Sequence, residues 1–133
     1  MTILGEKWSL LVVRELALGV NRFDDIQRNT GAPRDILSSR LRRLEETGVL
    51  ERRPYQERPL RHSYHLTESG DELRPILLTL SQWGEKWTPQ MNLVDWVHTC
   101  GEAVEVAHTC KACGGEVTGL DLRPRLRAKS AAA

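Results

Sequence analysis

The 133-residue chain carries 19 Lys and Arg against 18 Asp and Glu, for a formal net charge of +1. This length holds one domain with a real core plus an appendage. The sequence has no apolar run of the eighteen or more residues that cross a membrane, and its N-terminus lacks the pattern of a signal peptide. These features argue against a membrane or secreted protein, and we expect a cytoplasmic one.

The basic residues are concentrated in one part of the chain. Between Arg34 and Arg61 there are eight Arg and five acidic residues, although the two signs nearly cancel over the whole sequence. A local basic surface on a near-neutral protein is typical of nucleic-acid binding.

Two helices are predicted before this basic segment. Residues 7–18 form the first, because apolar side chains recur at helical intervals and Gly19 ends the run. These side chains are Trp8, Leu11, Val12 and Leu16. Residues 21–28 form a shorter second helix, with Asn21 as its cap and with Phe23 and Ile26 facing inward.

A third helix, within residues 31–48, is amphipathic. Pro33 suits its first position and Gly48 its C-terminal end, while Ile36, Leu37, Leu41 and Leu44 share one side. The outward side holds mostly Arg and Ser: Arg34, Asp35, Ser38, Ser39, Arg42 and Arg43. Arg suits guanine edges and Ser suits phosphates or bases, so the two helices joined by a Gly-containing turn indicate a DNA-reading helix-turn-helix. A solvated charged face is the competing interpretation.

The pattern then becomes extended. Residues 49–53 and 62–66 contain β-formers, and the two prolines of residues 54–61 predict a long loop outside any ladder. We interpret this segment as a β-hairpin wing with Arg58 and Arg61 at its tip and Arg52 nearer its base, in contact with the DNA backbone or a minor groove. For the tip, a solvated loop is equally compatible with the sequence.

A long helix is predicted from Thr67, its N-cap, with a kink near Pro75. Its narrow apolar stripe favours packing against a second subunit over packing within the chain. The stripe comprises Leu73, Ile76, Leu77, Leu80, Trp83 and Trp87.

The three cysteines favour a metal site or a redox switch over a disulfide framework. Cys110-x-x-Cys113-Gly-Gly has the form of a zinc knuckle, Cys100 supplies a third thiolate, and His98 or His108 could supply the fourth ligand. The spacing is only partly regular, because a standard zinc ribbon has two Cys-x-x-Cys arms and this chain has one. Structural zinc, reduced thiols without metal and a disulfide switch all remain open.

Four stretches of this sequence together resemble the HxlR-type winged-helix transcription regulators, bacterial and archaeal relatives of the MarR group. They are Gly5-Glu-Lys-Trp8, Arg22-Phe-Asp-Asp-Ile26, the segment 36–50 with Leu-Glu-Glu-Thr-Gly, and Tyr64-His-Leu-Thr-Glu-Ser-Gly70. The resemblance covers about residues 3–87. It implies a homodimer that binds a pseudo-palindromic operator on double-stranded DNA as repressor or activator. Family members often carry a Cys before the Gly-Lys-Trp element, and thiol sensing through that Cys is not carried over.

We therefore expect a mainly α fold with a small β-hairpin: a winged helix-turn-helix with a dimerising helix and a Cys-rich extension. The expected parts are residues 1–88, the extension 89–122 and a basic flexible tail 123–133. An enzyme using Cys110 or Cys113 with His108 is disfavoured, because no phosphate loop or paired-carboxylate motif accompanies them. Two functions compete with plain DNA-binding regulation: a regulator that responds to thiol oxidation, and a protein-interaction adaptor that has lost DNA binding.

Overall fold

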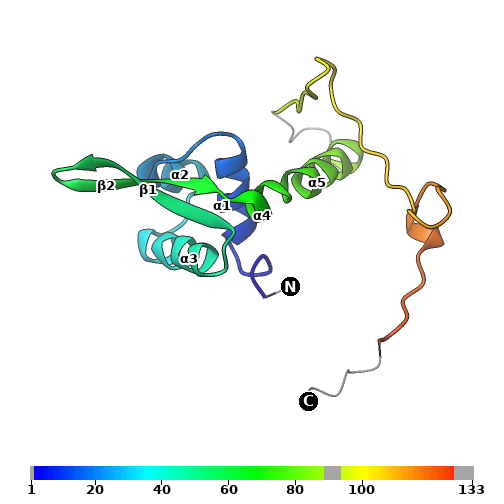
Figure 1. Ribbon diagram of the computed structural model, residues 1–133, viewed down its shortest axis with the longest axis horizontal. Coiled ribbons are helices and arrows are strands. Elements are labelled where there is room, and N and C mark those ends of the chain that lie inside the picture. Colours follow the sequence, from blue (N-terminus) through cyan, green and yellow to red (C-terminus); the bar gives the residue numbers. More distant parts are fainter. Residues whose placement is uncertain (1, 89–93, 128–133) are drawn as a thin grey trace. The chain divides into compact units, whose positions relative to one another are not determined.

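The computed structural model describes residues 2–88 and 94–127, and the chain divides into two compact units. The winged-helix unit is Met1–Leu93 and the C-terminal unit is Val94–Ala133. The first unit contains α1 (Ser9–Ala17), α2 (Phe23–Thr30), α3 (Arg34–Glu46), β1 (Leu50–Glu57), β2 (Leu60–Leu66), α4 (Glu68–Asp71) and α5 (Arg74–Trp87) (Figure 1). The expected fold class, a winged helix-turn-helix with one hairpin, is confirmed.

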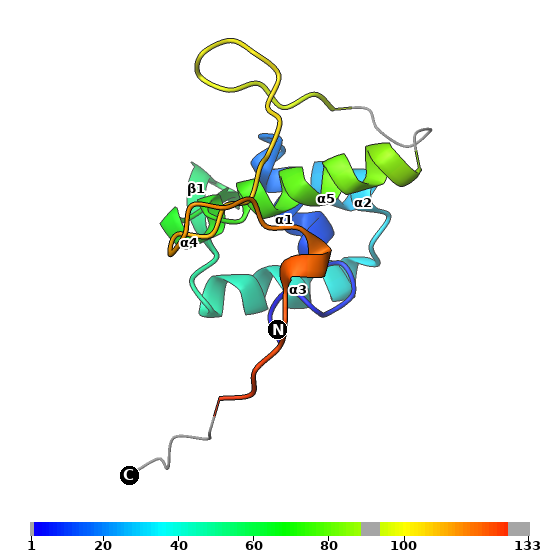
Figure 2. The ribbon, with the colours of Figure 1, turned by 90° about the vertical axis from the view of Figure 1, so that its right-hand side faces the viewer.

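The core of the winged-helix unit forms around α1. Val12, Val13 and Leu16 are buried on this helix, and it lies between α3 and α5 (Figure 2). Ile26 of α2 and Leu37 of α3 complete the centre of this core, each with no exposed surface. The apolar spacing of the sequence identified the buried Val12 and Leu16 of α1, Ile26 of α2 and the leucines of α3. On α1 it missed Val13, which is completely buried, and it included Trp8 and Leu11, which are only partly buried.

The turn between α2 and α3 fixes the angle of the helix-turn-helix. Gly31 has φ of 71°, a left-handed conformation that glycine adopts without a Cβ clash, and its N–H closes α2 on the carbonyl of Gln27 at 2.9 Å. Ala32 is completely buried beneath this turn. The predicted start of α2 was wrong: the helix begins at Phe23 after an extended Arg22, and no side chain caps it.

The hairpin is longer than the sequence predicted. β1 and β2 pair from Leu50 with Leu66 out to Glu57 with Leu60, and the register shifts between Pro54 and Gln56. The expectation of a long unpaired loop was therefore wrong. Pro54 is accommodated because β1 pairs on one side only, and an unpaired strand edge does not need its N–H.

The segment after the wing forms two helices where one kinked helix was expected. Thr67 caps α4 as predicted, accepting the N–H of Gly70 at 3.3 Å. A Cβ at Gly70 would lie 2.2 Å from the carbonyl oxygen of Val49, so only glycine fits where α4 meets the base of the wing. Pro75 lies in the first turn of α5, where its missing N–H leaves no helical hydrogen bond unmade.

The C-terminal unit has little regular structure. Its described residues, 94–127, form two isolated antiparallel bridges, Val97 with Ala103 and Thr109 with Glu116, and the short 3-10 helix η2 (Gly119–Asp121). The extension expected at residues 89–122 and the tail expected at 123–133 lie partly outside the described residues. No described helix is both long and apolar enough to cross a membrane.

Candidate nucleic-acid interface

Helix α3 presents the side chains that the sequence predicted for DNA contact. Leu37, Leu41 and Leu44 are buried on its inner side and hold the helix against the core. The six outward residues are all exposed: Arg34, Asp35, Ser38, Ser39, Arg42 and Arg43. A face held this rigidly can position its polar groups before any ligand arrives.

The arginines of this face differ in the partners of their guanidinium groups. Among the described residues, no side chain pairs with the guanidinium of Arg42 or Arg43. The guanidinium of Arg34 contacts Asp24 of α2 at 2.9 Å and lies over the ring of Phe23. Both members of that ion pair are exposed, and exposed pairs contribute at most about 1 kcal/mol, so DNA could replace Asp24 at little cost.

Arg40 belongs to α3 but not to its free face. Its guanidinium pairs with the Glu6 carboxylate at 2.9 Å and donates to the carbonyl of Lys7 at 3.1 Å. Arg40 thus holds the segment before α1 against α3. This partnership gives no local signal in the sequence, because 33 residues separate Arg40 from Lys7.

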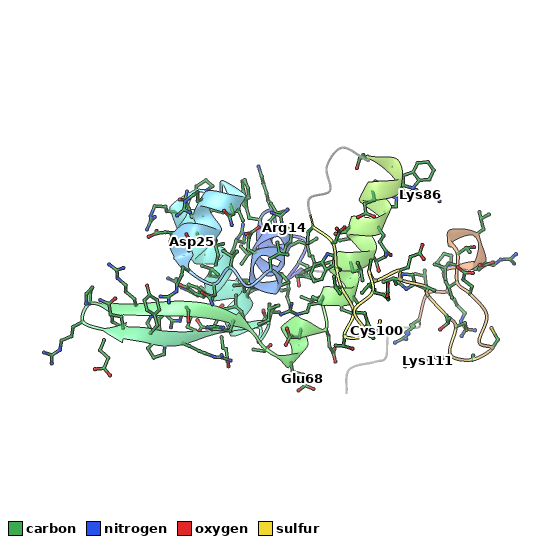
Figure 3. The ribbon with its side chains drawn as sticks, turned by 90° about the horizontal axis from the view of Figure 1, so that it is seen from above. Arg14, Asp25, Glu68, Lys86, Cys100 and Lys111 are labelled. Carbon is green, nitrogen blue, oxygen red and sulfur yellow. The ribbon has the colours of Figure 1, made fainter. Side chains whose placement is uncertain are left out.

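The wing places further arginines beside α3. Arg58 and Arg61 lie exposed at the hairpin tip, and among the described residues no side chain pairs with their guanidinium groups. Arg52, nearer the base, pairs with Glu45 of α3 at 3.1 Å. Figure 3 shows the hairpin extending beyond the helices. The tip arginines are therefore available to a polyanion, whereas Arg52 ties β1 to α3.

Arg22 supports the wing, a role that the sequence did not reveal. It forms an antiparallel bridge with Ser63 of β2, and its guanidinium stacks over the ring of Tyr55 at 3.2 Å. The Ser63 hydroxyl lies 2.7 Å from Nε2 of His65. Partial burial raises the pKa of Tyr64, and burial together with nearby Arg53 lowers the pKa of His65. The bridge and the stacking of Arg22 join the start of α2 to both strands of the hairpin.

Helix α5 has two apolar faces. Leu77 and Leu78 are buried within the chain, so Leu77 belongs to the chain's own core. The other face is open: Ile76, Leu80, Trp83 and Trp87 are 50%, 48%, 62% and 63% exposed. We call these four residues the α5 stripe; Leu73, just before the helix, is half-buried.

The three cysteines are free thiols, with Cys100 and Cys113 exposed and Cys110 partly exposed. Among residues 2–88 and 94–127, no three His, Cys, Asp or Glu side chains are close enough together to hold a metal ion. Hydrogen bonds from the backbone amides of Cys113 and Ala112, and from the Cys113 thiol, lower the pKa of Cys110. The candidate ligands are thus present, but the structure does not gather them.

An exposed arginine-bearing helix, set in a helix-turn-helix beside a basic hairpin, defines a winged-helix DNA-binding protein. The sequence pattern of one such family, the HxlR-like helix-turn-helix, matches residues 3–92. The chain belongs to this family. It is a DNA-binding transcription regulator and not an enzyme.

Relatives support the same assignment. An uncharacterized HTH-type transcriptional regulator of Mycobacterium tuberculosis is 42% identical over 127 residues, which cover 93% of this chain and 80% of that protein. The crystal structure of PA1607, a candidate transcription factor, has a TM-score of 0.76 and 32% identity, covering 93% of this chain and 89% of the other. Both likenesses extend past residue 92 into the C-terminal unit.

The winged-helix fold is also shared with a redox regulator. HypR, solved in its reduced form, has a TM-score of 0.58 and 31% identity, covering 64% of this chain and 85% of that one.

Proposed function

We propose that this regulator acts as a homodimer on a pseudo-palindromic operator, with α3 of each copy in the major groove and each wing on the flanking backbone. The observation that carries this proposal is the outward face of α3, on a helix fixed by three buried leucines. There Arg42 and Arg43 are exposed and have no side-chain partner in the described part of the chain. As a DNA-binding protein it would act in the prokaryotic cytoplasm, where the chromosome lies.

The chemistry of the α3 face suits base reading. Arg can bind the O6 and N7 atoms of guanine with two hydrogen bonds, and a carboxylate such as that of Asp35 can accept from the cytosine amino group. Ser38 and Ser39 can donate to phosphates or bases. The arginines at the wing tip, Arg58 and Arg61, would add affinity that does not depend on sequence.

The α5 stripe supports the homodimer. Its residues follow one another at intervals of four, three and four, which is the spacing of a helix–helix seam. Four large apolar side chains left about half or more exposed on one helix are unusual for a chain that works alone. Pairing with the same stripe of a second copy would remove them from water and would set two α3 helices in a two-fold arrangement.

Selection of genomic fragments bound by the purified protein, followed by footprinting, tests this proposal. We expect two related half-sites in inverted orientation, with centres about one helical turn apart or a multiple of it. The affinity should fall steeply as salt rises, because bound phosphates release counterions. A protein that binds no fragment above background at low salt would instead be the adaptor, and a single unrepeated site would contradict the dimer.

A thiol-responsive regulator is the second candidate. The lowered pKa of Cys110 favours the thiolate, which is the reactive form, and Cys113 lies within hydrogen-bonding distance of it. The similar structure of HypR belongs to a redox regulator. Operator affinity measured before and after mild oxidation decides this point: a change that disappears in Cys110→Ser supports thiol sensing, and no change contradicts it.

A further inference from the structure

We infer that the C-terminal unit is a zinc ribbon of the Cys3His type, in which His98 and Cys100 form the second arm that the Cys-x-x-Cys pattern lacks. The inference is independent of the DNA and dimer proposals. It rests on two turns of this unit that share a hydrogen-bond pattern and differ by one residue in length, each carrying a pair of candidate ligands.

The first turn spans residues 97–103 and is closed by the bridge between Val97 and Ala103. The N–H of His98 donates to the carbonyl of Glu102 at 2.9 Å. The N–H of Gly101, whose φ is 96°, donates back to the carbonyl of His98 at 2.9 Å.

The second turn spans residues 109–116 and is closed by the bridge between Thr109 and Glu116. It has the same pattern of hydrogen bonds with one additional residue inside the turn. The N–H of Cys110 donates to the carbonyl of Gly115 at 2.8 Å. The N–H of Gly114, whose φ is 74°, donates back to the carbonyl of Cys110 at 2.7 Å. Figure 3 marks the two turns by Cys100 and Lys111.

Relative to the left-handed glycine, the two turns place their ligands alike, although one residue separates His98 from Cys100 and two separate Cys110 from Cys113. In each turn the first ligand, His98 or Cys110, makes both of its backbone hydrogen bonds to the left-handed glycine and the residue after it. The second ligand, Cys100 or Cys113, immediately precedes that glycine. Two such turns, each offering two N or S ligands, are what a tetrahedral structural zinc site requires.

The same comparison selects His98 over His108 as the fourth ligand. Nδ1 of His98 lies 3.3 Å from the amide nitrogen of Cys100, so the imidazole is on the turn with its partner thiol. His108 lies just before the second turn. Its carbonyl accepts the N–H of Val117, on the other side of that turn, at 2.8 Å. Its position corresponds to no ligand of the first turn.

A metal would also explain how this unit is stabilised. None of the described residues from 94 to 127 is buried, and its larger apolar side chains, such as Val97 and Leu122, are mostly exposed. A segment without a core needs another source of stability, and in small units a structural metal is a common one. Zinc would bind the three thiolates, and their protons would pass to the solvent.

The two arms can reach a common ion. They are joined by residues 104–108, and five extended residues span at most roughly 17 Å. The N–H of Val104 and the carbonyl of His108 are hydrogen-bonded to Trp96 and Val117 of their own arms. Bringing the arms to a common ion would therefore change the backbone between these two residues, while both turns keep their internal hydrogen bonds.

The test is a titration of the reduced full-length protein with Co²⁺, followed by Zn²⁺. We expect one Co²⁺ per chain, the charge-transfer absorbance of thiolate ligands, the visible bands of a tetrahedral site, and displacement by Zn²⁺. His98→Ala should weaken metal binding by more than about tenfold. His108→Ala is the matched control and should leave it unchanged.

Three results would overturn the inference: absence of thiolate charge transfer in the wild type, an unchanged affinity in His98→Ala, or a loss in His108→Ala as large as that in His98→Ala. Cys100→Ser provides a second check, because a site made by Cys110 and Cys113 alone would not respond to it. The thermal melting of the winged-helix unit should be the same in all variants, which excludes global unfolding as the cause.

Discussion

Arg40 and Arg42 are two residues apart on α3, yet only the side chain of Arg40 is bound to other groups of the chain. Arg40 is bound to Glu6 and to the carbonyl of Lys7, whereas the guanidinium of Arg42 has no partner among the described residues. A guanidinium already paired within the chain stabilises the fold, and a free one on the outward face can bind a ligand. Their substitution should therefore affect different properties.

We expect Arg42→Ala to weaken operator binding and to leave the stability of the protein nearly unchanged. If Arg42 reads a base, the loss should be about 1–3 kcal/mol, and a mismatch at that base should no longer matter. If it contacts only phosphate, the loss should be smaller and equal for all sequences. Binding isotherms on the operator and on point-mutated operators distinguish these outcomes.

Arg40→Ala is the matched control. It should lower the free energy of unfolding by about 1 kcal/mol, because it removes one half-buried ion pair and one hydrogen bond. Its effect on operator affinity should be small once the protein is folded. Unchanged affinity in Arg42→Ala, or a larger loss in Arg40→Ala, would contradict the assignment of the outward face.

For the wing, the sequence predicted the correct type of element, a β-hairpin, but strands that were too short. Its β-formers and its place after α3 predicted a hairpin, and the structure has one. The prolines predicted a long loop, but a proline interrupts a ladder only where its N–H would face a partner. At position 54 the outer edge of β1 is open, so pairing continues to Glu57 and Leu60. Whether β1 has a second neighbouring strand depends on the topology of the sheet, which the local sequence does not specify.

The longer, paired wing leads us to predict how Arg58 and Arg61 affect the salt dependence of DNA binding. Because paired strands hold the tip in place, both side chains can meet the DNA backbone together. Replacing both by Ala should lower the slope of log affinity against log salt by about two units, since each contact with a phosphate releases nearly one counterion. Affinity measured between low and moderate salt gives this slope.

Arg53→Ala is the comparison variant for the wing. Arg53 is paired with Glu51 on the same strand, so its removal should change the slope less than removal of one tip arginine. An unchanged slope in the double variant would mean that the wing stands clear of the DNA.

The sequence revealed the apolar residues of α5 but not which of them the chain itself covers. Ile76 and Leu77 both fit a helical stripe, yet Leu77 is 6% exposed and Ile76 is 50% exposed. The division depends on how α5 meets α1, and that junction includes the hydrogen bond from Arg74 to the carbonyl of Ala17 at 2.6 Å. The ion pair of Arg40 with Glu6 and the stacking of Arg22 on Tyr55 were missed for the same reason: they join distant parts of the chain.

The junction of α5 with α1 also connects the proposed dimer interface to the DNA-binding helix α3. Arg74 fixes the start of α5 to the end of α1, and α1 packs against α3. If two copies pair through the α5 stripe, the separation of their α3 helices is set through this path. The half-site spacing of the operator should therefore depend on the intact dimer.

Leu80→Asp tests that dependence. Leu80 is 48% exposed in the single chain, so a carboxylate there remains in water and the monomer should fold normally. In the proposed dimer the same carboxylate would be buried without a partner, which costs several kcal/mol, so the dissociation constant of the dimer should rise about a hundredfold or more. Light scattering gives the mass, and circular dichroism confirms that the chain is folded.

Operator affinity of Leu80→Asp should fall together with dimerisation, because a monomer holds only one half-site and loses the second set of contacts. Leu80→Met is the matched control: it keeps an apolar side chain of similar volume and should remain dimeric with full affinity. A folded Leu80→Asp protein that stays dimeric would exclude the α5 stripe as the interface. A folded monomer with full operator affinity would instead separate dimerisation from DNA binding, since each α3 would then be sufficient by itself.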